Sequence, residues 1–285
     1  MPIIVTVIFV LLTFSLFNIA ISAPGGSNTE LSVITYTASP EGFMSNSHIL
    51  TGENEALLID AQFSGSDGRK VAELIKSTGK ELSGIIITHP HPDHYYGLEV
   101  LGMEFGDAEI TGGPETIAGV RNTSKYWTGA DGKLGTFSDM TVMQNGSLKL
   151  EDIEIVYRIF RGGESFENTV IYLPSSQTLF IGDLASSGVH MWVGENNVDK
   201  WIEQLRGIRS IGPIVKVYPG HGTVGGPNLL EQAEKYLLSF KESVNNSETI
   251  DEAVTKMKKL YPDYKMPQIL EGSVRAVMWP GSKPQ

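Results

Sequence analysis

The chain has 285 residues and a formal net charge of −11, which allows one large domain or two small ones with a sizeable core. An acidic surface repels phosphate backbones, and no Lys/Arg-rich run offsets it, so nucleic acid is not an expected partner. Hydrophobic residues make up 41% and charged residues 19%, a composition that indicates a folded protein rather than a disordered one.

The first feature along the chain is an apolar run over Ile3–Ile21, followed by the small residues Ser22 and Ala23. This pattern is typical of a secretory signal peptide, here over residues 1–23. It predicts a secreted, periplasmic or otherwise extracytoplasmic protein with no stable membrane insertion after cleavage. The run is also long enough to span a bilayer, so an uncleaved membrane anchor is the alternative.

Two further features bear on export. Three N-x-S/T triplets begin at Asn122, Asn145 and Asn245, and they predict a glycoprotein if the chain is exported in a eukaryote. The sequence contains no Cys, which is compatible with export. The lack of Cys excludes disulfides and any Cys-ligated metal.

After the leader, β-rich runs alternate with amphipathic runs. Strands are predicted over Leu31–Thr37, Met44–Thr51, Ala56–Ala61, Gly84–Thr88, Glu154–Phe160, Thr169–Leu173, Thr178–Ile181 and Ile214–Tyr218. Helices are predicted over Asp67–Ser77, Pro114–Thr123, Val198–Ile208, Leu229–Val244 and Ile250–Leu260. The short turns Gly52–Asn54 and Pro174–Gln177 predict β-hairpins.

The two halves of the chain carry similar β-rich patterns with outer helices, and the second half begins near Ser147. Such halves predict two sheets that pack face to face under covering helices. We expect one domain over residues 31–245 and a C-terminal helical extension over residues 246–285 that packs on it. Two stretches treated as loops, Tyr126–Thr141 and Met266–Trp279, are expected to shape a pocket.

The densest group of chemically reactive side chains follows the predicted strand Gly84–Thr88. Three His and one Asp lie within six residues there, at His89, His91, Asp93 and His94. Two intervening prolines fix the backbone φ angle, so that the side chains converge. Imidazole and carboxylate groups are ligands for Zn, Fe and Mn, and burying them without a partner is costly. The segment therefore predicts a metal site.

The segment His89–His94, placed after a hydrophobic strand, resembles the signature of the metallo-β-lactamase superfamily. Phe180–Asp183 resembles the strand end whose Asp bridges two metals, and Tyr218–Gly222 resembles the turn that supplies the last His ligand. The resemblance extends from Leu31 to Leu238. It implies an α+β fold, an αββα sandwich of two mixed β-sheets covered by helices, with the metals at one edge of the paired sheets.

One ligand position departs from the family pattern. The family carries a His in a segment like G-H-T-x-G-N, whereas the matching segment Gly163–Thr169 carries Glu164. Glu164 is the expected ligand, His190 is the alternative, and an incomplete site is the third possibility. His48 is expected to be a strand residue near the pocket. The pair Gly162-Gly163 is expected to let the backbone bend before the ligand.

The resemblance implies two divalent metal ions. One would be held by His89, His91 and Glu164, the other by Asp93, His94 and His221, with Asp183 bridging both. A metal lowers the pKa of bound water to about 7, so the two would share a hydroxide, and Asp93 is the expected catalytic residue that orients it and takes its proton. Zn is the expected metal. Mn or Fe are the alternatives, because the negative charge of Glu164 favours harder metal ions.

The resemblance implies a metal-dependent hydrolase that uses a metal-bound hydroxide to cleave an ester, lactone, thioester or amide of a small molecule. Similar β-lactamases carry Cys or Ser where Asp183 stands, which disfavours efficient β-lactam cleavage. A mononuclear iron dioxygenase of the persulfide dioxygenase type and a metal-free binding protein on the same fold are the alternatives. His190 and Trp192 are expected to line the substrate mouth. The sequence leaves the oligomeric state open.

Overall fold

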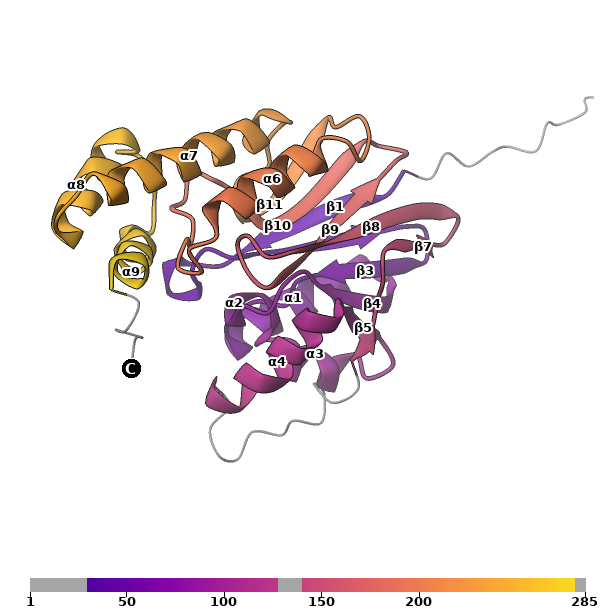
Figure 1. The fold of residues 1–285 in the computed structure, drawn as a ribbon. Helices are drawn as coiled ribbons and strands as arrows, with labels where there is room; N and C mark the ends of the chain where they lie inside the picture. The colour runs from indigo at the N-terminus through magenta and orange to yellow at the C-terminus, as the bar shows by residue number, and fades with distance from the viewer. Residues whose placement is uncertain (1–29, 128–139, 280–285) are drawn as a thin grey trace, which may run out of the picture.

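Two mixed β-sheets pack face to face in this computed structural model, and helices cover both outer faces (Figure 1). The structure describes residues 30–127 and 140–279. The expected α+β class and αββα sandwich are confirmed. The predicted leader over residues 1–23 lies outside the described residues, as does most of the predicted loop Tyr126–Thr141. No helix among the described residues is long and apolar enough to cross a membrane.

Each sheet combines antiparallel and parallel strands. The first sheet contains, in spatial order, β1 (Ser32–Thr37), β2 (Asn46–Thr51), β3 (Glu55–Ile59), β4 (Glu81–Ile87), β5 (Glu109–Gly112) and β6 (Thr141–Val142). The second contains β11 (Lys216–Gly222), β10 (Thr178–Ser187), β9 (Glu167–Leu173), β8 (Ile153–Arg161) and β7 (Gly146–Leu150). Strands β3 to β6 run parallel, as do β10 and β11, and the remaining neighbours are antiparallel.

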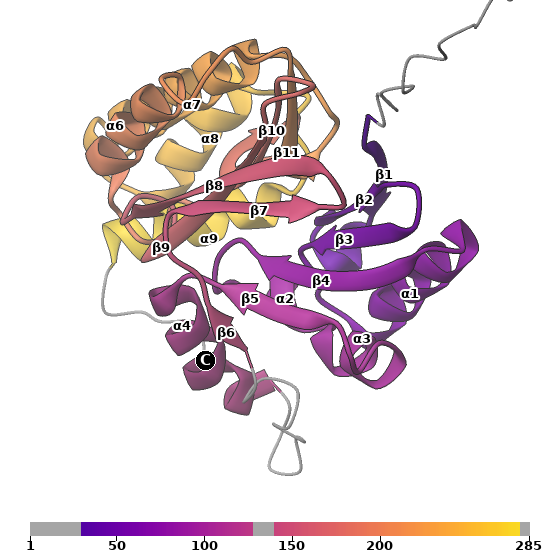
Figure 2. The ribbon, with the colours of Figure 1, turned by 90° about the vertical axis from the view of Figure 1, so that its right-hand side faces the viewer.

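The helices form two outer layers (Figure 2). On the side of the first sheet lie α1 (Gly65–Thr78), α2 (Pro92–Tyr95), α3 (Leu98–Glu104) and α4 (Pro114–Trp127). On the side of the second sheet lie α6 (Val198–Ile208), α7 (Asn228–Asn245), α8 (Ile250–Leu260) and α9 (Pro267–Met278). A short 3-10 helix, η1 (Pro40–Gly42), precedes β2.

The alternation of side chains along the strands separates three hydrophobic layers. In β3, Leu58 packs under the helices of the first sheet, whereas Leu57 and Ile59 face the second sheet. In β10, Phe180 faces the first sheet and its neighbour Leu179 packs under α6 and α7. Because successive side chains point to opposite faces of a strand, a strand covered on both sides needs apolar residues at every position. The near-continuous apolar runs of the sequence reflect this requirement.

Every predicted strand and helix has an observed counterpart, and several short elements were not predicted. The unpredicted strands are β5, β6 and β7, and the unpredicted helices are η1, α2, α3 and α9. The interpretation of Met266–Trp279 as a loop was wrong. Pro267 begins α9, and Leu270 and Val274, four residues apart on one face, are buried against the second sheet's helices. The C-terminal helices α8 and α9 share this core with α6 and α7.

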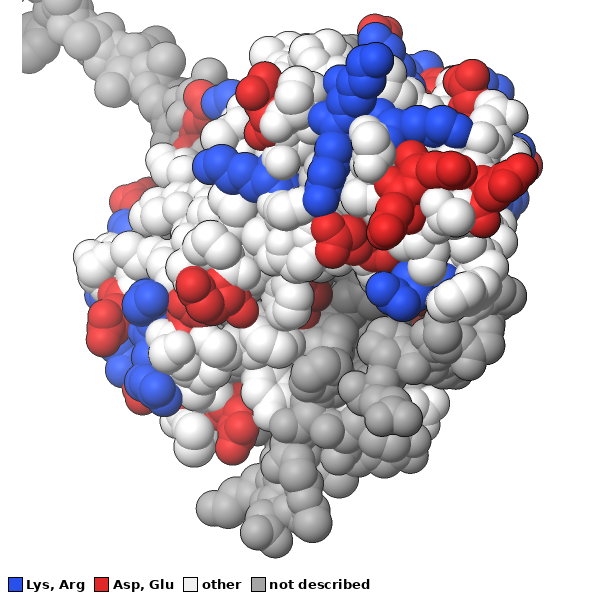
Figure 3. Space-filling view, turned by 90° about the vertical axis from the view of Figure 1, so that its left-hand side faces the viewer, with Lys and Arg blue, Asp and Glu red and all other residues white. Residues whose placement is uncertain are grey.

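Ion pairs tie the outer helices of the second sheet together. Lys241 of α7 binds Asp199 of α6, and Lys258 of α8 binds Glu271 of α9. On the face shown in Figure 3, basic and acidic side chains lie next to one another in the same region rather than on separate areas. Exposed pairs of this kind contribute little stability.

Candidate metal centre

The predicted ligands meet at one edge of the paired sheets. Four segments bring them there: the loop from the end of β4 into α2, the turn between β8 and β9, strand β10 and strand β11. Among the described residues, the donor atoms form three overlapping groups, in each of which they lie within 4.8 Å of one another. One group contains His89, His91, Glu164 and Asp183, a second contains Asp93, His94 and His221, and a third contains Asp60, His89 and His94. The first two, called the two donor groups below, contain the residues that the resemblance assigned to two metal sites.

Asp183 lies between the two groups. Its Oδ2 is 3.0 Å from Nε2 of His221 and 3.8 Å from Nε2 of His89, and its Oδ1 is 3.3 Å from Nε2 of His94. One carboxylate thus reaches donor atoms of both groups. This is the position that a bridging ligand requires.

Glu164 occupies the position at which a His was expected. Its Oε1 lies 2.8 Å from Nδ1 of His91, and its Oε2 lies 3.8 Å from Nε2 of His89. The carboxylate is fully buried, while the ring of His190 lies outside both groups. Glu164, rather than His190, therefore sits among the donors.

Glycines at two places make this arrangement possible. Gly163 precedes Glu164 with a φ of 89°, a left-handed conformation that glycine adopts without steric cost. Gly162 also has a positive φ, of 79°, so this pair of glycines bends the backbone before Glu164. Gly220 packs against Asp183, and a Cβ at this position would lie 1.9 Å from its Oδ1. Any larger residue would displace the bridging carboxylate.

A second set of hydrogen bonds orients three of the imidazoles. Nδ1 of His94 donates to Asp60 (2.9 Å), Nδ1 of His89 bonds to the Thr88 hydroxyl (2.9 Å), and Nδ1 of His221 donates to the Phe43 carbonyl (2.9 Å). In each ring the other nitrogen, Nε2, faces the donor groups. Partners of this kind fix the tautomer and direct the free nitrogen at a metal.

Asp60 and Phe43 were not identified from the sequence. Asp60 follows β3 with a φ of 60° and also accepts bonds from the amide and hydroxyl of Thr88. The signal that could have found it is its place at the end of a buried strand, parallel and adjacent to the strand that releases His89. Phe43 contributes through its backbone carbonyl, which carries no sequence signal.

Replacing Asp60 by Asn is expected to lower metal affinity about 10- to 100-fold, because loss of an outer partner leaves His94 less basic and less well oriented. The measurement is competition with a chromophoric chelator. Asp67→Asn is the matched control, since Asp67 is a buried Asp of α1 that bonds to Tyr36 and Ser64 away from the centre. An equal loss in both variants would show a general folding effect instead.

Two observations indicate that the side chains around the centre suit cations. Nε2 of His89, Nε2 of His94 and Oδ1 of Asp183 are buried without a hydrogen-bond partner among the described residues. Four carboxylates, those of Asp60, Asp93, Glu164 and Asp183, also lie around these atoms. Unpaired buried polar atoms and clustered negative charges are costly unless positive charge compensates them. The donor set of imidazoles and carboxylates fits divalent metal ions.

The pKa values of these side chains also reflect the clustered negative charge. Burial lowers the pKa of His91, but the Glu164 carboxylate outweighs this effect and raises it to about 9. Burial likewise opposes the Asp183 carboxylate at His221, whose pKa rises to about 10. For Asp183, burial raises the pKa, and His221 and His94 hold it well below its usual range. Metal binding is therefore expected to release protons from these imidazoles.

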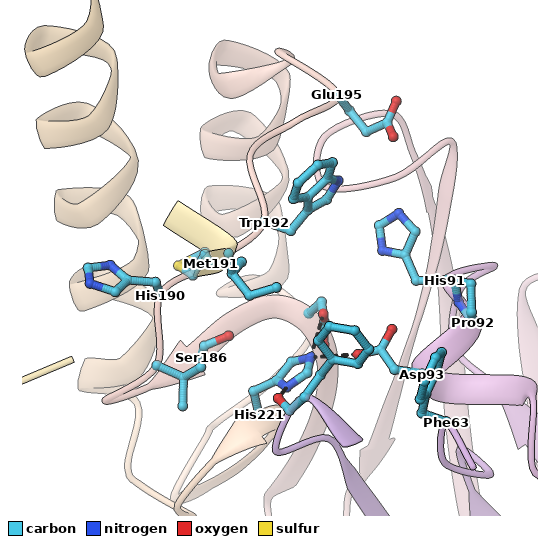
Figure 4. A pocket seen from close by; sticks show the side chains of 14 residues that line it. Phe63, His91, Pro92, Asp93, Ser186, His190, Met191, Trp192, Glu195 and His221 are labelled. Atoms are coloured by element: carbon cyan, nitrogen blue, oxygen red, sulfur yellow. Dashed lines mark hydrogen bonds and ion pairs between the residues drawn. The ribbon is translucent and has the colours of Figure 1, made fainter. Parts of the chain in front are cut away.

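A pocket of about 310 Å³ opens onto the centre (Figure 4). Asp93, Asp183 and His221 reach its floor, and Trp192 forms part of its wall. His190 is also among the lining residues, but its ring points away from the centre, and its Nδ1 lies 2.9 Å from the Tyr236 hydroxyl. The structure thus brings Trp192 to the mouth and turns the His190 side chain toward the outer helices.

His48 lies in β2, as expected, and not among the donors. The residue is 3% exposed, and its Nε2 donates to the Pro219 carbonyl at 3.1 Å. Burial lowers its pKa to about 4. His48 therefore stays neutral in the folded protein while the unfolded chain takes up a proton near pH 6.5.

This difference predicts an acid sensitivity. The stability that comes from neutral His48 is complete above pH 6.5 and is lost as the pH falls toward 4, by about 3 kcal/mol in total. His48→Gln keeps a donor for the Pro219 carbonyl but does not titrate. Urea unfolding at pH 7 and pH 4.5 is expected to show a smaller loss of stability in the variant. Equal losses would contradict the assignment.

The comparisons with known proteins agree with this geometry. The family model described as metallo-beta-lactamase superfamily matches residues 40–226. A metallo-beta-lactamase type 2 of Bacillus cereus is 27% identical over 209 residues, which are 71% of this chain and 75% of the relative. The solved metallo-beta-lactamase from Pontibacter korlensis superposes with a TM-score of 0.60 at 20% identity over 73% of this chain and 99% of that chain, which supports the fold alone.

The name of a third relative indicates a different class of substrate. Exodeoxyribonuclease WalJ of Streptococcus pneumoniae is 29% identical over 143 residues, which are 46% of this chain and 51% of the relative. The expectation that nucleic acid is not a partner therefore stays a prediction.

The match of the family model over residues 40–226 and the two donor groups lead to one conclusion. The chain belongs to the metallo-beta-lactamase superfamily and is a metallo-hydrolase of that superfamily.

Proposed function

We propose that this protein hydrolyses an ester, lactone, thioester or amide of a small molecule. The observation that carries the proposal is the pair of donor groups joined by Asp183 at the floor of a pocket of about 310 Å³. That volume is at the lower end of the range for sites that take small molecules. The absence of Cys from the chain and the presence of Asp183 in place of a Cys or Ser disfavour efficient β-lactam cleavage.

Seven residues would hold two divalent metal ions: His89, His91, Glu164 and Asp183 on one side, and Asp93, His94 and His221 on the other with Asp183 shared. Bound there, the ions would supply a Lewis acid for the substrate carbonyl and lower the pKa of a water molecule. The second, complete group of donors favours two metals over the single iron of a dioxygenase, which would leave that group without a role.

Asp93 is the residue that would accept the proton from the attacking water. It lines the pocket, and its Oδ2 lies 3.3 Å from Nε2 of His221 and 3.5 Å from Nε2 of His94. Burial raises the pKa of Asp93, but His94 and His221 outweigh it and hold the pKa well below its usual range. The carboxylate is therefore ionised at neutral pH, as a proton acceptor must be.

The test is elemental analysis of the purified protein, followed by turnover of a panel of neutral esters, lactones, thioesters and amides. The proposal expects two divalent ions per chain and metal-dependent hydrolysis of at least one class. A single iron with oxygen consumption would favour a dioxygenase instead. A protein that binds no metal after reconstitution would support a metal-free binding protein.

A further inference from the structure

The walls of the pocket above the centre are apolar on both sides. Phe43 and Phe63 form one side, with ring centroids 4.9 Å apart in an edge-to-face contact. Met191 and Trp192 lie on the opposite side (Figure 4), and Ile269 also lines the pocket. Ile269 comes from α9, so the C-terminal helix helps to shape the pocket. Such walls bind an apolar group by removing its surface from water.

None of the described residues that line this pocket is Lys or Arg. The charged carboxylates along it are those of Asp93, Asp183 and Glu195. Glu195 is exposed and stands at the rim beyond Trp192 (Figure 4). Between the apolar walls, a carboxylate or phosphate group on a ligand would lose its hydration without gaining a Lys or Arg partner.

Glu164 also changes the charge of the centre. An ionised Glu164 carries one negative charge, whereas a His that binds a metal is neutral. With the same metal ions bound, the centre is therefore one charge unit less positive than a centre with a His at this position. The smaller positive charge weakens the attraction of an anionic substrate from a distance.

We infer that the pocket selects substrates whose acyl part is apolar and carries no negative charge, such as neutral aliphatic or aryl-alkyl esters and lactones. The inference rests on the proposed hydrolase function, because it assumes that the reacting carbonyl lies at the donor groups. The apolar part then lies between the Phe43–Phe63 side and the Met191–Trp192 side. Anionic compounds of the same length are poor ligands.

The first experiment measures binding without turnover. Three hydroxamates share a metal-binding head and a six-carbon chain that ends in a methyl, a carboxylate or an ammonium group, and each is titrated calorimetrically into the metal-loaded protein. The neutral chain is expected to bind about tenfold more tightly than the carboxylate chain, or better. Equal or tighter binding of the carboxylate chain would overturn the inference, and so would failure of all three to bind.

Glu195→Lys tests the rim charge directly. The variant is expected to improve binding of the carboxylate chain relative to the neutral chain about fivefold, since a repulsive charge is replaced by an attractive one. Glu73→Lys is the matched control, because Glu73 is an exposed residue of α1 outside the pocket. The same improvement in both variants would show a general effect of net charge and would count against a role of the rim.

Turnover of the matching esters separates this inference from the proposed function. If the neutral hydroxamate binds best and no ester, lactone, thioester or amide is hydrolysed, the proposed function fails and the selectivity of the pocket stands. If neutral and anionic esters are hydrolysed equally well, the hydrolase function stands and the inferred selectivity is wrong.

Discussion

Replacing Glu164 by His is expected to shift the metal preference of the protein toward Zn²⁺ and away from Mn²⁺. Carboxylate oxygens suit hard ions such as Mn²⁺, whereas imidazole nitrogens suit Zn²⁺. Glu164 is fully buried, with its Oε1 2.8 Å from Nδ1 of His91 and its Oε2 3.8 Å from Nε2 of His89, so water does not screen its charge. Its substitution therefore acts directly on the donor set.

The size of the effect follows from the lost charge. A unit charge about 4 Å from a second one contributes roughly 4 kcal/mol at an effective dielectric constant near 20, which sets an upper bound because the new imidazole donates in its place. We expect Mn²⁺ affinity to fall on the order of 100-fold and Zn²⁺ affinity to fall much less.

Competition titrations of both metals in the natural protein, Glu164→His and Glu164→Gln measure this ratio. The Gln variant is the control, because it removes the charge with little change of shape and adds no imidazole. It is expected to weaken both metals without favouring Zn²⁺. An unchanged Mn²⁺ to Zn²⁺ ratio in Glu164→His would contradict a ligand role for Glu164.

Asp93→Asn is expected to lower kcat roughly 10²- to 10⁴-fold, the range for loss of a positioned proton acceptor. The amide has nearly the same shape as the carboxylate but does not accept a proton. It would also place an NH₂ group or a neutral oxygen where Oδ2 now lies 3.3 Å from Nε2 of His221.

Two measurements separate loss of chemistry from loss of metal. kcat is determined at saturating metal, and the metal content per chain is determined on the same sample. Asp152→Asn, in the exposed turn between β7 and β8, is the matched control and is expected to retain full activity. A fall of less than tenfold in Asp93→Asn with full metal content would assign the proton to another group.

Much of the fold could be predicted because its signals are local. Residues 84–87 of β4 and nearly all of β10 are buried, so their apolar runs were visible in the sequence. Helices such as α6 and α7 were also visible, because the apolar residues of their buried faces recur with the period of a helix. Strand β6 has two residues and β5 has four, too few to establish a period, and they form because neighbouring strands supply their hydrogen bonds.

The predicted ligands came from a different kind of signal. His89 to His94 are adjacent in sequence, so their convergence depends on one turn, whereas Glu164, Asp183 and His221 reach the centre from separate segments and were placed by their order in the family resemblance. The structure brings all of them together. The side chain of His190 could not be placed from its spacing, because its direction depends on Tyr236 of a helix distant in sequence.

The sequence by itself determined the apolar strands, the amphipathic helices and the chemical nature of the donors, because each depends on residues close together in the chain. Only the tertiary structure decided which partners hold the donors and what shapes the pocket. Asp60 reaches His94 across parallel strands, the Phe43 carbonyl reaches His221 across 178 positions, and α9 carries Ile269 to the pocket wall. These contacts depend on how distant segments pack. No local sequence pattern indicates which partner a backbone carbonyl or an apolar side chain will contact.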